Sequence, residues 1–225
     1  MEFYKASQEP NRSSYCFADA IVREPENGQY YHQNGKLYSS NGTLFSEDVE
    51  WEFNFQKYLE KNNIQNLNAV SLFFGANDLF PWGHYEEIPK LVEQFMENMK
   101  LFIQKVNEAD PSIDIIINLP LPSSSQNAFA NRHGCQMTDK EYRTAMREGT
   151  KAILREFEGK DGIYICPTSH VIDTVNGFDT ASIRESLYCD KQCIVAADPV
   201  HPNATGYRQI GDALAGAVEK LRHKK

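Results

Sequence analysis

Two kinds of hydrophobic pattern alternate along the chain, and their alternation predicts an α/β fold. Short apolar runs are typical of strands buried in a parallel sheet, whereas apolar residues at every third or fourth position indicate helices packed on it. The runs predict strands at 15–18, 69–74, 113–118 and 162–166. The periodic segments predict helices from 46 to 61, from 88 to 109, from 138 to 157 and from 204 to 221. Such a chain forms a parallel sheet with helices on both faces, a three-layer α/β/α sandwich.

The same pattern makes more specific predictions about single segments. The helix that begins at Ile88 is expected to pack its apolar stripe into the core. The last helix is expected to bury Ile210, Leu214, Ala217 and Val218. Residues 23–46 are polar and contain three Asn-Gly steps, which favour tight turns. They predict a long surface loop that includes a hairpin.

Charge and length narrow the possible functions. The 225 residues carry 31 acidic and 23 basic side chains, a formal net charge of -8. A nucleic-acid surface would need clustered Lys and Arg, so a neutral or cationic small ligand fits better. The length suits a single domain over 1–225. No stretch is apolar enough for a membrane span, and no signal peptide follows Met1, although a chain trimmed of its signal would look the same.

The five cysteines are an odd number in a chain large enough to fold without disulfides, so isolated thiols are expected. Cys189 and Cys193 are close enough in sequence to pair in an oxidising compartment. No His or Cys at ligand spacing indicates zinc, and no cofactor is expected. The sequence does not set the oligomeric state.

One loop with candidate chemistry is Gly75-Ala76-Asn77-Asp78, directly after the second predicted strand. Glycine permits a sharp turn there, and the Asn77 amide can face a developing oxyanion. Taken alone, the same residues also describe a turn in which Asn and Asp bond their own backbone.

A second such loop, Asp198-Pro199-Val200-His201-Pro202, precedes the last helix. Asp198 and His201 lie three residues apart on a turn stiffened by prolines. This spacing can set a carboxylate against one imidazole nitrogen and leave the other nitrogen as a general base. A lone histidine before a helix is otherwise satisfied by backbone groups.

Together the two loops resemble the third and fifth blocks of the SGNH (GDSL) hydrolases in residue identity, order and context. In that family Gly-x-Asn-Asp follows a strand and Asp-x-x-His-Pro opens the last helix. Upstream, Phe17-Ala18-Asp19-Ala20 resembles the first block, Phe-Gly-Asp-Ser, with alanine in place of its glycine and its serine. Ser40-Asn41-Gly42 resembles the second block. The resemblance covers about 15–221 and implies a flavodoxin-like SGNH hydrolase fold.

Carried over by position, the resemblance implies roles for five residues. Ala20 occupies the position of the nucleophile, His201 is the base and Asp198 orients it. The oxyanion hole consists of the backbone N–H groups of Ala20 and Gly42 and the side chain of Asn77. Alanine has no hydroxyl to attack a carbonyl, so this chain is expected to bind an ester without turning it over. Ala20 is either an engineered replacement of serine or the mark of a natural pseudoenzyme.

Two other functions compete with an ester hydrolase. A natural non-catalytic module would use the same pocket to bind an ester, a lipid or a glycan. A metal-dependent hydrolase would use Asp19, Asp78, Asp198 and His201, because Asp and His on loops can bind a divalent ion.

The substrate class follows only from the resemblance. The strings around Asn77 and His201 resemble those of bacterial secreted lipases, phospholipases and glycerophospholipid acyltransferases more than those of sugar acetylesterases. This implies a lipid-like or choline-type ester and an extracellular or periplasmic location. The aromatic residues Phe80, Trp82 and Tyr85 indicate a substrate wall or a cover of the core. The loop serines 123–125 are expected to be solvated or to cap turns.

Overall fold

The structure is a computed structural model that describes residues 18–20, 30–33, 36–39, 44–46, 51–53, 55–80, 85–126, 128–129, 138–186 and 188–223. The chain divides into two compact units. The first comprises residues 1–67 and 102–111, and the second comprises residues 68–101 and 112–225. The single domain expected over 1–225 stays a prediction.

The first unit contains short antiparallel strands and one helix. These elements are β1 (Ala18–Ala20), β2 (Tyr30–Gln33), β3 (Lys36–Ser39), β4 (Leu44–Ser46), β5 (Trp51–Phe53) and α1 (Phe55–Lys61). β1 pairs with β5, and β2, β3 and β4 form a sheet in that order. Gln33 pairs with Lys36, so only Asn34-Gly35 joins β2 to β3. This pairing confirms the hairpin predicted from the Asn-Gly steps. The long loop predicted over 23–46 is wrong at 30–33, 36–39 and 44–46, which are paired strands.

Two boundaries predicted for this part of the chain differ from the structure. The strand expected at 15–18 overlaps β1 only at Ala18, and residues 15–17 lie outside the described ranges. The first helix begins at Phe55 instead of position 46, because 44–46 and 51–53 are paired as strands. The aromatic residues Trp51 and Phe53 favour a strand there, although their spacing with Tyr58 also fits a helix.

The second unit contains the parallel sheet that the apolar runs predict. Its strands are β6 (Ala69–Leu72), β7 (Asp114–Asn118) and β8 (Ile163–Cys166), in the order β6-β7-β8 and all parallel. The isoleucines of the central strand β7 are almost completely buried. β6 is buried at Leu72, but Ser71 and Phe73 are exposed, so the burial expected for 69–74 holds only in part.

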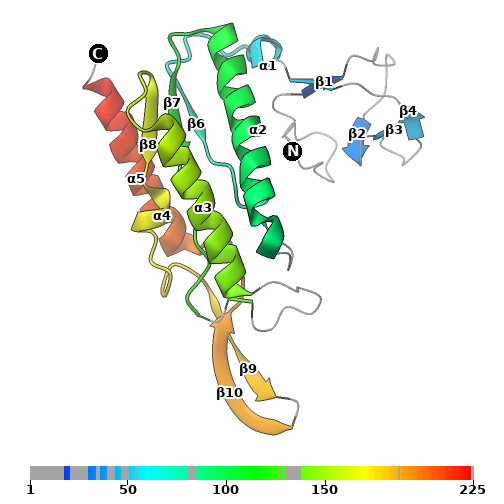
Figure 1. Ribbon diagram of the computed structural model, residues 1–225, viewed down its shortest axis with the longest axis vertical. Coiled ribbons are helices and arrows are strands. Elements are labelled where there is room, and N and C mark those ends of the chain that lie inside the picture. Colours follow the sequence, from blue (N-terminus) through cyan, green and yellow to red (C-terminus); the bar gives the residue numbers. More distant parts are fainter. Residues whose placement is uncertain are drawn as a thin grey trace. The chain divides into compact units, whose positions relative to one another are not determined.

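Helices cover both faces of this sheet (Figure 1). α5 (Ala204–Arg222) packs on one face, where Leu221 joins Ile116 and Cys166 in a buried cluster. α2 (Ile88–Ala109) and α3 (Asp139–Phe157) lie on the other face. The short helices η1 (Tyr85–Glu87) and α4 (Thr168–Val171) precede α2 and follow β8. The predicted α/β fold class is therefore confirmed.

The sequence locates the helix ends of the second unit within a few residues. Thr138 begins α3 with a capping box, in which its hydroxyl accepts from the N–H of Glu141 and the Glu141 carboxylate accepts from the N–H of Thr138. One burial prediction is wrong: Val218 is 42% exposed. Its neighbours Leu214 and Ala217 on α5 are partly buried against the sheet cluster.

An antiparallel hairpin that the sequence pattern did not predict comes directly before Asp198. It consists of β9 (Thr180–Ser186) and β10 (Cys189–Ala196). Cys189 and Cys193 lie on the same extended strand, about 13 Å apart by the rise of a strand. A disulfide needs Cα atoms within about 7 Å. The pairing of these two cysteines that the sequence left open does not fit this strand.

Candidate functional site

The candidate residues of the second unit lie on loops at the carboxyl edge of the parallel sheet. Asn77 follows β6, and residues 119–126 follow β7. Because β6 and β7 run parallel, both loops leave the sheet at the same edge. The N–H of Ser124 donates to the carbonyl of Pro199 at 3.0 Å, which brings the loop of Asp198 and His201 to this edge.

Asp198 and His201 form a hydrogen-bonded pair. The Oδ2 atom of Asp198 lies 3.1 Å from Nδ1 of His201, and Oδ1 accepts from the backbone N–H groups of Val200 and His201, each at 3.0 Å. Burial raises the pKa of Asp198, but these hydrogen bonds outweigh it and hold the pKa below its usual range. The carboxylate is therefore charged at neutral pH and accepts a hydrogen bond from the Nδ1–H group of His201.

The second ring nitrogen of His201 faces solvent. The side chain is 72% exposed, and none of the residues in the described ranges hydrogen-bonds Nε2. An imidazole whose Nδ1–H is held by a carboxylate carries its lone pair on Nε2. The pair can therefore take a proton from a group that approaches from solvent.

The start of α5, directly after His201, is fixed by its cap. The Oδ1 atom of Asn203 accepts from the N–H groups of Thr205 and Gly206 at 3.0 and 3.1 Å, and its Nδ2 donates to the carbonyl of Asn176. These bonds satisfy backbone donors that a helix start leaves without partners.

Replacing Asn203 by alanine is expected to lower the free energy of unfolding by about 1 kcal/mol, because it removes this cap. Replacement by aspartate keeps an acceptor oxygen and is expected to lower it less. Urea unfolding of both variants measures the difference. An equal loss in the two variants would show that the cap does not stabilise this helix.

The loop that carries Asn77 depends on two glycines. Gly75 has a φ of 115°, a backbone angle that residues with a side chain rarely adopt. A Cβ there would also lie 3.0 Å from Pro120. Leu79 is completely buried against Gly149 of α3, where a Cβ would lie 2.4 Å from a Leu79 methyl group. Asn77 itself is exposed. The loop is thus anchored on both sides of an accessible amide.

Tyr142 of α3 lies between the two candidate loops. Its ring packs edge-on against Phe80 at 5.7 Å, and its hydroxyl donates to the carbonyl of Leu121 at 3.4 Å. Burial raises the pKa of Tyr142, and the charge of Asp198 adds to the rise. Phe80 also contacts Phe129, so it covers the core as one of the two sequence hypotheses expected. Tyr85 is 46% exposed, and Trp82 lies outside the described residues.

The loop serines agree with the sequence prediction only in part, because Ser124 caps a turn and Ser125 is exposed as expected, but two of the three are buried. Ser123 and Ser124 are completely buried, and only Ser125 is exposed. The Ser124 hydroxyl donates to the carbonyl of Thr174 and accepts from the N–H of Gln126. A short run of serines gave no signal of this burial, because the groups that cover it come from residues distant in sequence.

The remaining predicted residues belong to the first unit. Ala20 is the last residue of β1, and Gly42 lies outside the described ranges. The proximity of Ala20 to His201 stays a prediction. Within the residues that the structure describes, no three His, Cys, Asp or Glu side chains group as metal ligands, and no helix has both the length and the apolar character to cross a membrane.

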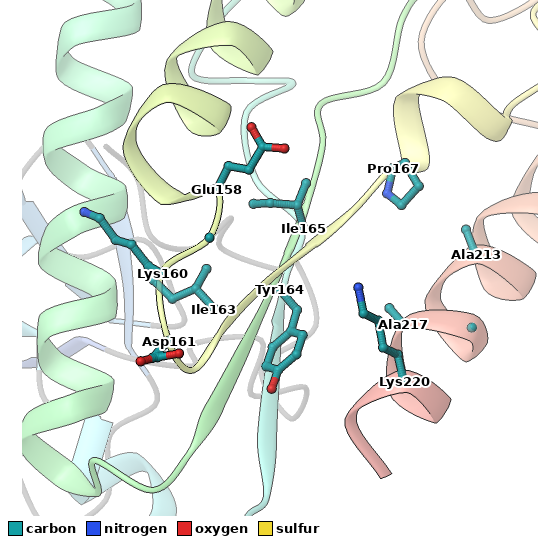
Figure 2. Close-up of a pocket in the computed structure, with 12 residues that line it drawn as sticks. Glu158, Lys160, Asp161, Ile163, Tyr164, Ile165, Pro167, Ala213, Ala217 and Lys220 are labelled. Atoms are coloured by element: carbon teal, nitrogen blue, oxygen red, sulfur yellow. The ribbon is translucent and has the colours of Figure 1, made fainter. Parts of the chain in front are cut away.

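A cavity of about 680 Å³ lies apart from these loops. Figure 2 shows its walls, which come from the loop 158–161 before β8, from β8 itself and from Ala213, Ala217 and Lys220 of α5. Asn77, Asp198 and His201, the predicted site residues that the structure describes in the second unit, do not line it. Ligands of open α/β sheets bind at the carboxyl ends of strands, and this cavity begins at the amino end of β8. It is therefore not the candidate active site.

A family model described as GDSL-like lipase/acylhydrolase matches residues 29–214. The matched range contains Gly42, Asn77, Asp198 and His201 and begins after Ala20. The chain belongs to the GDSL-like lipase/acylhydrolase family, and its parallel sheet with flanking helices is the α/β fold of the SGNH hydrolases.

Among solved structures, the chain is similar to "Salicylyl-Acyltransferase SsfX3 from a Tetracycline Biosynthetic Pathway", with 15% sequence identity and a TM-score of 0.37. The likeness covers 74% of this chain and 41% of that one. No curated protein matches the sequence.

Proposed function

We propose that this protein is a carboxylic ester hydrolase of the GDSL class in which Ala20 occupies the place of the nucleophilic serine. The observation that carries the proposal is the Asp198–His201 pair at the carboxyl edge of the sheet, with Nδ1 held at 3.1 Å and Nε2 open to solvent. An imidazole held in this way is the general base of a serine-type triad.

The chemistry assigns each residue a step. A serine at position 20 would attack the ester carbonyl carbon while its proton passes to Nε2 of His201. The proton then passes to the leaving alcohol as the carbon–oxygen bond breaks, and water hydrolyses the acyl-enzyme by the same route. The N–H groups of positions 20 and 42 and the amide of Asn77 stabilise the negative oxygen. With alanine at position 20, the first bond cannot form.

The experiment that tests this proposal restores serine at position 20 and follows p-nitrophenol release from esters of increasing acyl length. Ala20→Ser is expected to produce hydrolysis that the starting protein lacks, and His201→Ala in the same protein is expected to remove it. The profile over acyl length shows which acyl groups the site accepts, and we propose a lipid-like or choline-type ester outside the cytoplasm as the substrate.

A second candidate function is a non-catalytic domain that binds an ester, a lipid or a glycan. The alanine at position 20 favours it, because the chain lacks a hydroxyl at that position. In this case Ala20→Ser stays inactive while a non-hydrolysable ester analogue still binds in calorimetry. Full activity of Ala20→Ser in a chelator excludes the metal-dependent alternative that uses Asp19, Asp78, Asp198 and His201.

A further inference from the structure

The segment that carries Asp198 is clamped from the loop after β7. The N–H of Ala196 donates to the carbonyl of Gln126 at 2.7 Å, and the N–H of Ser124 donates to the carbonyl of Pro199 at 3.0 Å. One bond precedes Asp198 and the other follows it. The position of the loop 124–126 therefore determines where the Asp198 carboxylate lies.

Arg143 of α3 binds this loop through two donors. Its Nη2 donates to the carbonyl of Ser124 at 2.9 Å, and its Nε donates to the hydroxyl of Ser123 at 3.2 Å. The Ser123 hydroxyl in turn donates to Oδ1 of Asp139, one turn earlier on the helix, at 3.0 Å. Both serines are completely buried, so the loop cannot exchange these bonds for bonds to water without opening.

We propose that Arg143 is a positioning residue for the Asp198–His201 pair. Arg143 donates to the carbonyl of Ser124, and the N–H of Ser124 donates to the carbonyl of Pro199. Through these two bonds the rigid helix α3 sets the position of the Asp198 carboxylate. Arg143 acts through Ser124 and touches no reacting atom. The effect of Arg143 on the reaction rate rests on the proposed function, whereas its effect on the geometry of the Asp198–His201 pair does not.

The planar guanidinium suits this task better than other cations. Its Nε and Nη2 atoms point in fixed directions and reach two acceptors at once, whereas a lysine ammonium is a single point on a flexible chain. Ser124 is buried and its hydrogen bond to Arg143 is partly buried, so loss of the charged donor takes from this carbonyl a partner that holds it in place. Removal of Arg143 therefore releases the loop that flanks Asp198.

The test compares Arg143→Gln and Arg143→Lys with Arg147→Gln. Arg147 lies one turn further along α3, is exposed and pairs with its neighbour Glu148 at 3.2 Å, so it controls for the loss of one charge from this helix. The first readout is the tautomer of His201 from the ¹⁵N shifts of the ring. The starting protein and Arg147→Gln are expected to hold the Nδ1–H form, and Arg143→Gln to shift towards the Nε2–H form of free imidazole.

The second readout is kinetic and uses the Ala20→Ser background. Arg143→Gln is expected to lower kcat by about 10²-fold with little change in KM, because a displaced base affects the reaction and not the binding of the ester. Arg143→Lys is expected to lose less kcat than Arg143→Gln. Arg147→Gln is expected to leave kcat unchanged.

The two proposals fail in different ways. An inactive Ala20→Ser protein overturns the ester hydrolase, and the tautomer measurement still tests Arg143. An unchanged tautomer in Arg143→Gln overturns the positioning role even where the restored protein is active. If Arg143→Gln does not fold, Arg143→Lys decides: it keeps the charge but replaces the two fixed donors by a single flexible ammonium, and a tautomer identical to that of the starting protein counts against the proposal.

Discussion

In a protein restored by Ala20→Ser, replacing Asp198 by asparagine is expected to lower kcat by about 10⁴-fold, the order of magnitude for this change in a serine-type triad. The reason lies in how the carboxylate is held. Oδ1 of Asp198 accepts from two backbone N–H groups, each at 3.0 Å, so the oxygen of an asparagine must occupy that place. Its NH₂ group then faces Nδ1 of His201 and donates to it.

The expected result is thus a histidine with the wrong tautomer. An Nδ1 that accepts a hydrogen bond leaves the proton on Nε2, where the base must be free to take one from serine. Steady-state kinetics on a p-nitrophenyl ester measures the loss. Asp212→Asn is the matched control, because Asp212 is an exposed carboxylate on α5 with the same change of charge. Equal activity of Asp198→Asn and Asp212→Asn would show that Asp198 is not a member of the triad.

The contact between Asp198 and His201 is the kind of feature that a sequence can predict. The two residues lie three positions apart, and the prolines between and after them restrict the turn. The geometry is therefore decided by neighbouring residues. The same holds for the cap at Thr138 and the hairpin at Asn34-Gly35, where a few adjacent residues specify the backbone.

Features that depend on distant contacts gave no such signal. Ser123 and Ser124 are buried by Arg143, Thr174 and Pro199, which approach only when the sheet and α3 are in place. The hairpin of β9 and β10 was missed because each strand mixes apolar and charged residues too closely to show a clear period. The roles of Ala20 and Gly42 depend on the packing of residues far apart in sequence, and they stay predictions.

Replacing Gly206 by alanine is expected to lower the free energy of unfolding by about 1–3 kcal/mol, the usual range for overpacking. A Cβ at this position would lie 2.4 Å from the carbonyl oxygen of Gly177 and 2.7 Å from Cβ of Pro202. Neither atom can rotate away as a flexible side chain can. The Gly177 carbonyl is also held, because it accepts from the N–H of Asn203 at 2.9 Å. The start of α5 must therefore shift.

Gly211→Ala on the same helix separates this clash from the helix propensity of alanine. A Cβ at Gly211 would meet nothing within 4 Å, so the exchange is expected to raise stability by up to about 1 kcal/mol. Urea unfolding of the two variants should thus give changes of opposite sign. Because Gly206 follows His201 by five residues, Gly206→Ala in the Ala20→Ser background should also lower kcat, whereas Gly211→Ala should not. If Gly206→Ala and Gly211→Ala both stabilise the protein, α5 does not approach Gly177 this closely. The position of His201 would then depend on the turn of Asp198 alone.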